Sequence, residues 1–155
     1  MSLKKKDKKD RIVVGWREWV SLPDLGVQHV KAKIDTGART SALHAFYVHP
    51  YKKRGESRVK FGLHPYQNNT SYAVECDAHV IDYRNVTDSG GHREKRYVIS
   101  THLALAGTVW EIEMTLTNRE NMKFRMLLGR TAMTKRVVVD PGRSYLLGTL
   151  KKSKR

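Results

Sequence analysis

The stretch Ala32-Lys33-Ile34-Asp35-Thr36-Gly37-Ala38 decides how this 155-residue chain is interpreted. Apolar residues alternate with polar ones up to Ile34, which is the period of a strand with one solvated face. Asp35 then leaves the strand where Gly37 allows a tight turn close to the carboxylate. A second glycine-broken strand, Met126-Leu127-Leu128-Gly129-Arg130, follows much later and opens a short helix. The two segments predict a pair of loops built on strand ends.

Strand signals dominate the rest of the chain. Segments around residues 30–34, 74–80, 110–117 and 123–128 share a period of two, and Val137–Val139 is a short apolar run. An Asp140-Pro141-Gly142 turn then predicts a returning strand over Tyr145–Leu147. Residues 12–20 are a less regular pair of strands, with residues 23–26 as the turn that follows them. Helix is expected only over Arg130–Arg136, so the sequence predicts a small, mainly antiparallel β domain.

Two polar stretches interrupt the strands. Residues 50–69 are rich in Lys, Arg, Gly, Pro and Asn, which predicts a loop or a hairpin with a mobile tip. Residues 85–95 form a second polar insertion, with Gly90-Gly91 at its turn. We therefore expect one β domain over residues 12–150, flanked by disordered basic tails at 1–11 and 151–155.

Charge is the strongest feature of the composition. The chain carries 30 Lys and Arg against 15 Asp and Glu, a formal net charge of +15. Residues 1–11 and 151–155 contribute +4 each, so about half of the excess lies on the tails. A basic body with basic arms favours partners such as nucleic acid, the ribosome or an acidic protein tail.

Compartment and cofactor signals are few. The single cysteine, Cys76, alternates with its neighbours as in a strand, which favours a buried small side chain over a reactive thiol. The N-terminus has no apolar signal region, and no segment has the ~18 apolar residues of a membrane span, so we expect a cytoplasmic protein without a membrane partner. A phosphate-binding Gly-Lys-Ser/Thr loop is absent as well, and no cofactor is expected.

The two glycine-broken segments together resemble the retropepsin family of aspartic peptidases. In that family an apolar strand runs into Asp-Thr-Gly-Ala, and a later apolar-apolar-Gly-Arg segment crosses beneath it. The wider stretch from Ile34 to Ala45 is similar to a bacterial branch labelled ATP-dependent zinc proteases, encoded beside ATP-grasp glutamate ligases. The resemblance covers about residues 28–135 and implies a small closed β barrel of the acid-protease type with one short C-terminal helix.

The resemblance implies a homodimer in which Asp35 of each chain forms half of a catalytic dyad. Two carboxyl groups about 3 Å apart share one proton, so one acts as base on water and the other as acid on the scissile carbonyl. Thr36, Gly37 and Ala38 would complete the active-site loop, and Leu128, Gly129 and Arg130 the supporting loop. A hairpin between Pro50 and Tyr83 would be the flap over a peptide or protein substrate. The simpler reading is that Asp35 only caps a turn.

Two positions bear on how far the resemblance carries. Arg39 follows the tetrad where many retroviral enzymes have an acidic residue that holds substrate backbone, so the substrate contacts differ. Asp88-Ser89-Gly90 offers an internal partner for Asp35, but it does not follow an apolar strand, and we interpret it as a hairpin tip. A two-lobed enzyme would also need two domains, so the peptidase hypothesis requires dimerisation.

Three other functions stay open. The branch label suggests a zinc-dependent protease, but His-Glu-x-x-His is absent, and a site from His44, Glu75 and His79 has no spacing signal. We therefore predict no metal residues. The chain could instead be a basic module that binds nucleic acid or the ribosome, with Trp16, Trp19 and Tyr47 stacking on bases. A fold that has lost peptidase activity and serves as an accessory to a ligase is the third possibility.

Overall fold

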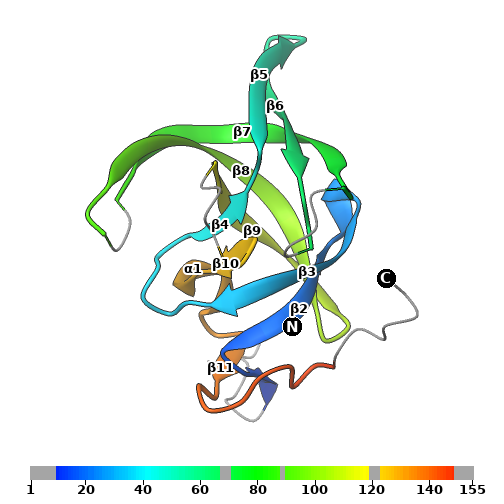
Figure 1. Cartoon of the computed structure of the whole chain (residues 1–155), viewed down its shortest axis with the longest axis vertical. Helices are drawn as coiled ribbons and strands as arrows, with labels where there is room; N and C mark the ends of the chain where they lie inside the picture. The colour runs from blue at the N-terminus through cyan, green and yellow to red at the C-terminus, as the bar shows by residue number, and fades with distance from the viewer. Residues whose placement is uncertain (1–9, 67–70, 88–89, 119–122, 149–155) are drawn as a thin grey trace, which may run out of the picture.

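A computed structural model of the chain describes residues 10–66, 71–87, 90–118 and 123–148. Nearly all of its regular structure is strand (Figure 1). The elements are β1 (Ile12–Val14), β2 (Arg17–Leu22), the 3-10 helix η2 (Pro23–Leu25), β3 (Val27–Ile34), β4 (Ser41–His44), β5 (Tyr47–Lys53), β6 (Glu56–Leu63), β7 (Val74–Thr87), β8 (Arg93–Leu105), β9 (Thr108–Thr117), β10 (Met126–Leu128), α1 (Arg130–Met133) and β11 (Val137–Val139). The predicted mainly β fold is confirmed.

The main sheet bends back on itself. Its nine strands follow the order β2-β3-β10-β4-β9-β8-β7-β6-β5. A further bridge between Ser21 of β2 and Ala104 of β8 joins two strands that lie far apart in this order, so the first six strands form a ring. Closing a sheet in this way pairs strands that would otherwise be exposed edges.

The core fills the inside of this ring. The apolar side predicted for β9 is confirmed, because Trp110, Ile112, Met114 and Leu116 are all at most 6% exposed. Of the polar residues predicted on the other side, only the two glutamates are solvated, since Thr115 and Thr117 are buried. The four apolar side chains pack with fully buried side chains from the surrounding strands. These are Leu22, Val30, Leu43, Ile99, Leu103, Met126 and Leu128. Burial of this apolar surface is the main stabilising contribution to the barrel.

Two hairpins extend beyond the ring (Figure 1). The β5–β6 hairpin turns at Arg54 and Gly55, which both have positive φ, as a two-residue turn with the right-handed strand twist requires. The β7–β8 hairpin is longer, and β7 carries a bulge between Val80 and Asp82. The predicted polar insertion at 85–95 is therefore mostly strand, because pairing between β7 and β8 outweighs weak local strand preferences.

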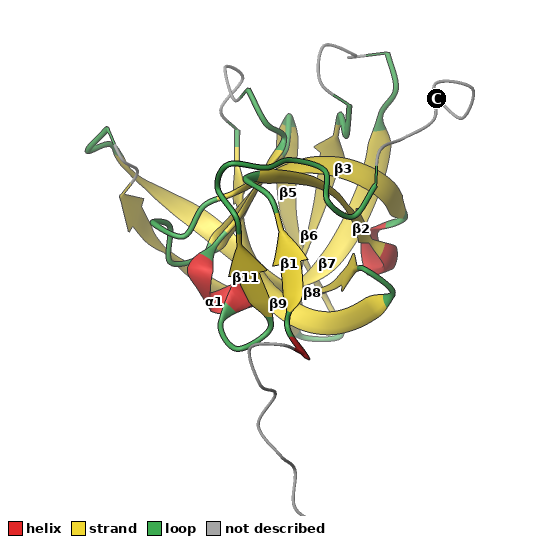
Figure 2. Ribbon diagram, turned by 90° about the horizontal axis from the view of Figure 1, so that it is seen from below, coloured by secondary structure: helices red, strands yellow, loops and turns green. Residues whose placement is uncertain are grey.

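The ends of the domain pair in a second, two-stranded sheet. β1 runs parallel to β11, with Val13 opposite Val138, and Figure 2 shows the two strands side by side. The irregular strand pair predicted over 12–20 is thus two strands with separate partners, since β2 pairs with β3 through the η2 turn. The tails predicted at 1–11 and 151–155 lie outside the described residues, apart from residues 10 and 11.

Two predicted elements at the C-terminal side are wrong or too long. The returning strand over Tyr145–Leu147 does not form, because the amides of Leu146 and Leu147 donate to the carboxylate of Glu18 instead of to a sheet. Tyr145 also has a positive φ of 55°. The helix predicted to reach Arg136 ends at Met133, and the chain then turns into β11.

Candidate active site

Strand β10 places the two glycine-broken segments side by side. It pairs parallel to β3, with Leu128 opposite Ile34, and antiparallel to β4, with Met126 opposite Leu43. The amide of Asp35 then donates to the carbonyl of Leu128 at 2.9 Å. The loop that carries Asp35 and the loop that begins at Gly129 therefore leave the sheet at the same edge.

The carboxylate of Asp35 is fixed by its own loop. Oδ1 accepts hydrogen bonds from the amides of Gly37 at 3.1 Å and Ala38 at 3.2 Å. Asp35 is half-buried, whereas Thr36 and Gly37 are exposed. The second oxygen, Oδ2, accepts no hydrogen bond from any described residue. This oxygen is therefore open to a donor other than the described residues.

The start of helix α1 is hydrogen-bonded to the Asp35 loop. The amide of Arg130 donates to the carbonyl of Ala38 at 2.7 Å, and the amide of Thr131 donates to that of Arg39 at 3.0 Å. The Arg130 guanidinium reaches across to the carbonyl of Thr36 at 3.0 Å. The two backbone amides lie at the start of the helix and have no partner within it. The supporting loop thus holds the active-site loop at three points.

Gly129 allows the two loops to approach this closely. A Cβ at this position would lie 2.5 Å from the backbone carbon of Thr40, so any larger residue would force the backbones apart. The Gly129 amide donates to Oγ of Ser41 at 2.9 Å, and Ser41 is fully buried. Sequence reasoning gave Ser41 no role, although Ser41 lies within the stretch from Ile34 to Ala45 that carries the resemblance.

A polar chain continues from Ser41 toward the β7–β8 hairpin. The hydroxyl of Thr115 donates to the carbonyl of Ser41 at 3.3 Å, and the guanidinium of Arg96 donates to that hydroxyl at 3.4 Å. Arg96 is 7% exposed and pairs with Glu94 at 2.6 Å. Sequence reasoning missed this chain, because its members are close only in the folded protein.

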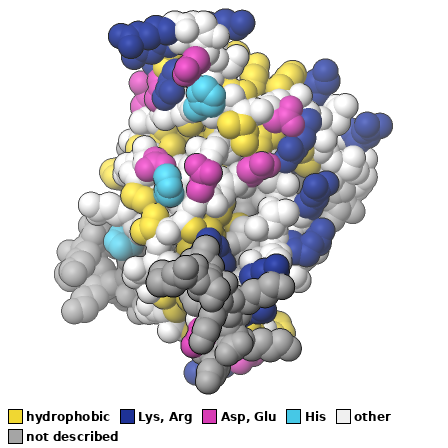
Figure 3. Space-filling view, turned by 180° about the vertical axis from the view of Figure 1, so that it is seen from behind, with side chains coloured by type: hydrophobic (Ala, Val, Ile, Leu, Met, Phe, Trp, Pro, Cys, Tyr) yellow, Lys and Arg dark blue, Asp and Glu magenta, His cyan; other side chains and the backbone are white. Residues whose placement is uncertain are grey.

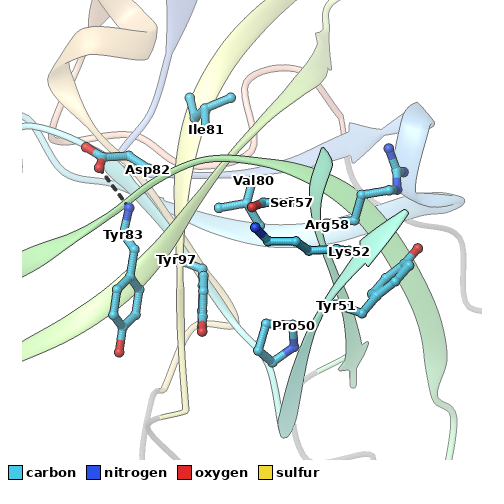
Figure 4. A pocket seen from close by; sticks show the side chains of 10 residues that line it. All are labelled: Pro50, Tyr51, Lys52, Ser57, Arg58, Val80, Ile81, Asp82, Tyr83 and Tyr97. Atoms are coloured by element: carbon cyan, nitrogen blue, oxygen red, sulfur yellow. Dashed lines mark hydrogen bonds between the residues drawn. The ribbon is translucent and has the colours of Figure 1, made fainter. Parts of the chain in front are cut away.

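The surroundings of Asp35 in one chain are open. A groove of about 510 Å³ lies between the β5–β6 hairpin and β7, lined by residues such as Tyr51, Arg58 and Tyr83 (Figure 4). Asp35 is not among its lining residues. A single chain therefore presents the carboxylate on an exposed loop and not at the bottom of that groove.

The residues considered for zinc are not brought together. His79 approaches Glu56 at 3.6 Å, and Glu75 accepts a hydrogen bond from the hydroxyl of Tyr47, whereas His44 lies on another strand, β4. No group of three or more His, Cys, Asp or Glu side chains in the described ranges could hold a metal ion.

The structure also tests the interpretation of the single cysteine. Cys76 is buried, and burial raises the pKa of its thiol to about 12, so it stays a protonated, unreactive side chain, in agreement with the sequence interpretation. Asp88 and Ser89, weighed as an internal partner for Asp35, lie outside the described residues. Gly90 follows them before β8 begins.

A strand that runs into Asp-Thr-Gly, locked to a Gly-Arg loop by a short central strand, defines the site of a retropepsin-like protein. The model of the family described as "RimB-like: Retropepsin-like aspartic endopeptidase RimB" matches residues 13–149. The chain therefore belongs to the RimB-like family.

Curated relatives connect the domain with another protein class. The chain is 48% identical over 139 residues to a protein of Shewanella pealeana named "Probable alpha-L-glutamate ligase", and 46% identical over 141 residues to one of the same name from Parasynechococcus marenigrum. The matches cover 90% and 91% of this chain, but the chain spans only 30% of the length of either relative.

A solved structure shares the fold. The protein Lpg0085 of Legionella pneumophila, described as being of unknown function, superposes with a TM-score of 0.74 at 25% identity. The match covers 87% of this chain and 97% of the other.

None of the helices in the part of the chain that the structure describes is long and apolar enough to cross a membrane.

Proposed function

We propose that the protein is a homodimeric aspartic peptidase in which Asp35 of two chains forms the catalytic dyad. The observation that carries this proposal is the geometry of Asp35. One carboxylate oxygen is held by two amides, and the other accepts nothing from the described part of its own chain. A two-fold axis beside the loop would bring the free oxygen to its counterpart in the second copy.

The proposed mechanism uses the shared proton of the pair. One Asp35 carboxylate removes a proton from a bound water, which attacks the carbonyl carbon of the scissile peptide. The other Asp35, protonated, donates to the carbonyl oxygen as it gains charge, and a tetrahedral diol forms. Proton transfer to the amide nitrogen then releases the amine product. Arg130 holds the loop through its hydrogen bond to the Thr36 carbonyl.

Gly37 supports this arrangement. A Cβ at this position would meet only Oδ1 of Asp35, at 3.4 Å, which is ordinary van der Waals contact. The fold of one chain therefore does not require glycine here. We attribute the glycine to the close approach of substrate backbone or of the partner's loop on the exposed side. To Thr36, which is exposed beside it, we assign a hydrogen bond across the proposed dimer.

The flap prediction over Pro50 to Tyr83 stays a proposal. That range contains the last part of β5, the whole of β6 and the first part of β7. A hairpin over the dyad would exclude water and hold the substrate in extended form.

The substrate and partner follow from the relatives and from charge. Because the relatives are named alpha-L-glutamate ligases, we propose that this protein is an accessory of such a ligase and cleaves protein tails that the ligase has extended. Arg39, exposed directly after the active-site loop, supplies positive charge for an acidic tail. We expect it to act in the cytoplasm.

Replacement of Asp35 by Asn tests the proposal. Asp35→Asn removes the shared proton and should abolish cleavage of an acidic peptide library, while Asp10→Asn, an exposed carboxylate elsewhere, should cleave at the wild-type rate. Circular dichroism and light scattering would verify that both variants keep their fold and assembly. Cleavage by Asp35→Asn at an undiminished rate would refute the dyad, and activity lost to a chelator would favour the zinc alternative.

A further inference from the structure

The outer face of strands β2 and β3 carries alternating aromatic rings and cations, which we call the ladder. Its five members are Trp16, Arg17, Tyr145, Lys31 and Trp19. The Arg17 guanidinium carbon lies 4.6 Å from the centre of the Trp16 ring and 4.7 Å from that of Tyr145. The Lys31 ammonium lies 5.9 Å from the Tyr145 ring and 5.3 Å from that of Trp19. Each cation thus stands between two rings, within the range of cation–π attraction.

Strand register builds the ladder. Trp19 lies opposite Lys31 and Arg17 lies opposite Lys33, so the four side chains alternate onto one face of the β2–β3 pair. The C-terminal segment runs beside β2 (Figure 1) and brings Tyr145 onto the same face, with its amide donating to the carbonyl of Arg17 at 3.0 Å. Nothing in Asp35 or its loop takes part.

The charge on this face differs from that on the rest of the molecule. On β6 to β8, arginines are matched by carboxylates, as in the pairs of Arg58 with Asp77 and of Arg84 with Asp82. Figure 3 shows the opposite side of the molecule, where acidic side chains lie among Lys and Arg. In residues 15–20, 27–34 and 143–148, by contrast, the one carboxylate is Glu18, which is fully buried.

Three cations of this face, Arg17, Lys33 and Arg143, make no ion pair with any described residue. Lys33 and Arg143 are exposed, and Trp16, Trp19 and Tyr145 are half-buried, so part of each ring meets solvent. The face offers unneutralised positive charge together with accessible ring surface.

We propose that the ladder face binds single-stranded RNA. Phosphates of an extended strand would be neutralised by Arg17, Lys33 and Arg143, while bases stack on the exposed parts of Trp16 and Trp19. An acidic peptide would use the cations alone, whereas RNA uses both the cations and the aromatic rings. We therefore favour RNA as the ligand. This site lies on the domain itself and not on the basic tails, and it is independent of the proposed peptidase activity.

Fluorescence anisotropy of a labelled twelve-residue oligouridylate with the full chain tests the proposal. Trp19→Leu keeps the charge but removes one stacking ring, so it should weaken binding by roughly 5- to 100-fold. Lys33→Ala/Arg143→Ala should weaken binding and make the plot of log affinity against log salt about 1.4 shallower, because two phosphate contacts are lost. Urea denaturation would show that the variants stay folded.

A matched control removes the same charge elsewhere. Lys52→Ala/Lys53→Ala, at the tip of the β5–β6 hairpin, should leave affinity within about twofold of wild type. Equal losses in both double variants, or wild-type affinity in Trp19→Leu, would reduce the binding to net charge and overturn the proposal. Competition by a ten-residue oligoglutamate as strong as that by oligouridylate would overturn it too, in favour of an acidic peptide.

Discussion

Gly129 and Gly37 lie in adjoining loops, but their surroundings differ. Gly129 is enclosed by the backbone of Thr40 and Ser41, with 2.5 Å to the nearest atom from a Cβ at this position. Gly37 faces solvent, with a single contact at 3.4 Å. Neither has a positive φ, so only space distinguishes alanine from glycine at these positions.

Gly129→Ala should therefore destabilise the fold. The added methyl group meets rigid backbone, and relief requires the two loops to separate, at a cost of about 1–3 kcal/mol in the free energy of unfolding. Gly37→Ala should change that free energy by less than about 0.5 kcal/mol yet reduce peptide cleavage, because its methyl group occupies the approach side of the loop. Urea denaturation and a cleavage assay on both variants would measure this. A large loss of stability in Gly37→Ala would contradict the proposal that this glycine serves the approach of substrate or of the partner's loop and not the fold.

Glu18 is the other residue whose role is local and decisive. It is 0% exposed, and its two oxygens accept the amides of Gly15 at 2.7 Å, Leu146 at 2.9 Å and Leu147 at 3.1 Å. Glu18→Gln turns an amide nitrogen toward one of these donors, which leaves buried donors unsatisfied and should lower the free energy of unfolding by about 2–3 kcal/mol. Exposed Glu111→Gln is the control and should stay within about 0.5 kcal/mol. An equal effect of both would show that Glu18 makes no special contribution.

At the scale of elements, the η2 turn is fastened to β8 by a pair of titratable side chains. Nδ1 of His102 lies 2.7 Å from Oδ2 of Asp24, and the same oxygen accepts the backbone amide of His102 at 3.2 Å. The hydrogen bond to Asp24, and then the attraction between the two charges, raise the pKa of His102 above its ordinary value of 6.5.

A raised folded-state pKa sets the direction of the pH effect. The stabilisation from this pair is fully present below the unfolded pKa of histidine, about 6.5, and is lost as pH rises through the higher folded value. The free energy of unfolding of wild type should therefore exceed that of His102→Gln by more at pH 5.5 than at pH 9. Urea denaturation at the two pH values checks this. If the difference in the free energy of unfolding between wild type and His102→Gln grew with pH, the stabilising pair of His102 and Asp24 would be contradicted.

The strands could be predicted where one face is buried and the other solvated. Trp110 to Met114 alternate because only one side of this part of β9 meets the core, whereas Thr115 on the other side is buried as well. Tyr145–Leu147 is the reverse case, since its apolar pattern resembles a strand but its amides bond to a glutamate more than a hundred residues earlier. Contacts at such separation leave no mark in a local window of sequence.

Only the parts of the candidate site that belong to local motifs could be predicted from the sequence. Asp35 and Gly129 belong to short motifs whose glycines reveal tight backbone, so the sequence predicts both loops. Ser41, Glu18 and Arg96 act through distant partners, and a serine, a glutamate or an arginine carries no sign of burial in its neighbours. The structure brings the two predicted loops together and adds the residues that hold them.

At the scale of the whole molecule, the proposed dyad has a consequence for mixtures of chains. Suppose that two Asp35 side chains share one site, and that wild type is unfolded and refolded with an equal amount of Asp35→Asn. Random pairing then gives both carboxylates to only about a quarter of the dimers. Cleavage per chain should fall to about a quarter of the wild-type rate. Chains that act singly would keep about half, which would exclude the shared site.

The parallel pairing of β1 with β11 has a consequence of another kind. Residues 12–14 and 137–139 enclose nearly the whole domain between them, so this small sheet forms only after the chain between has been synthesised. It also ties the first strand of the domain to the last, so the loss of either strand leaves the other without its partner.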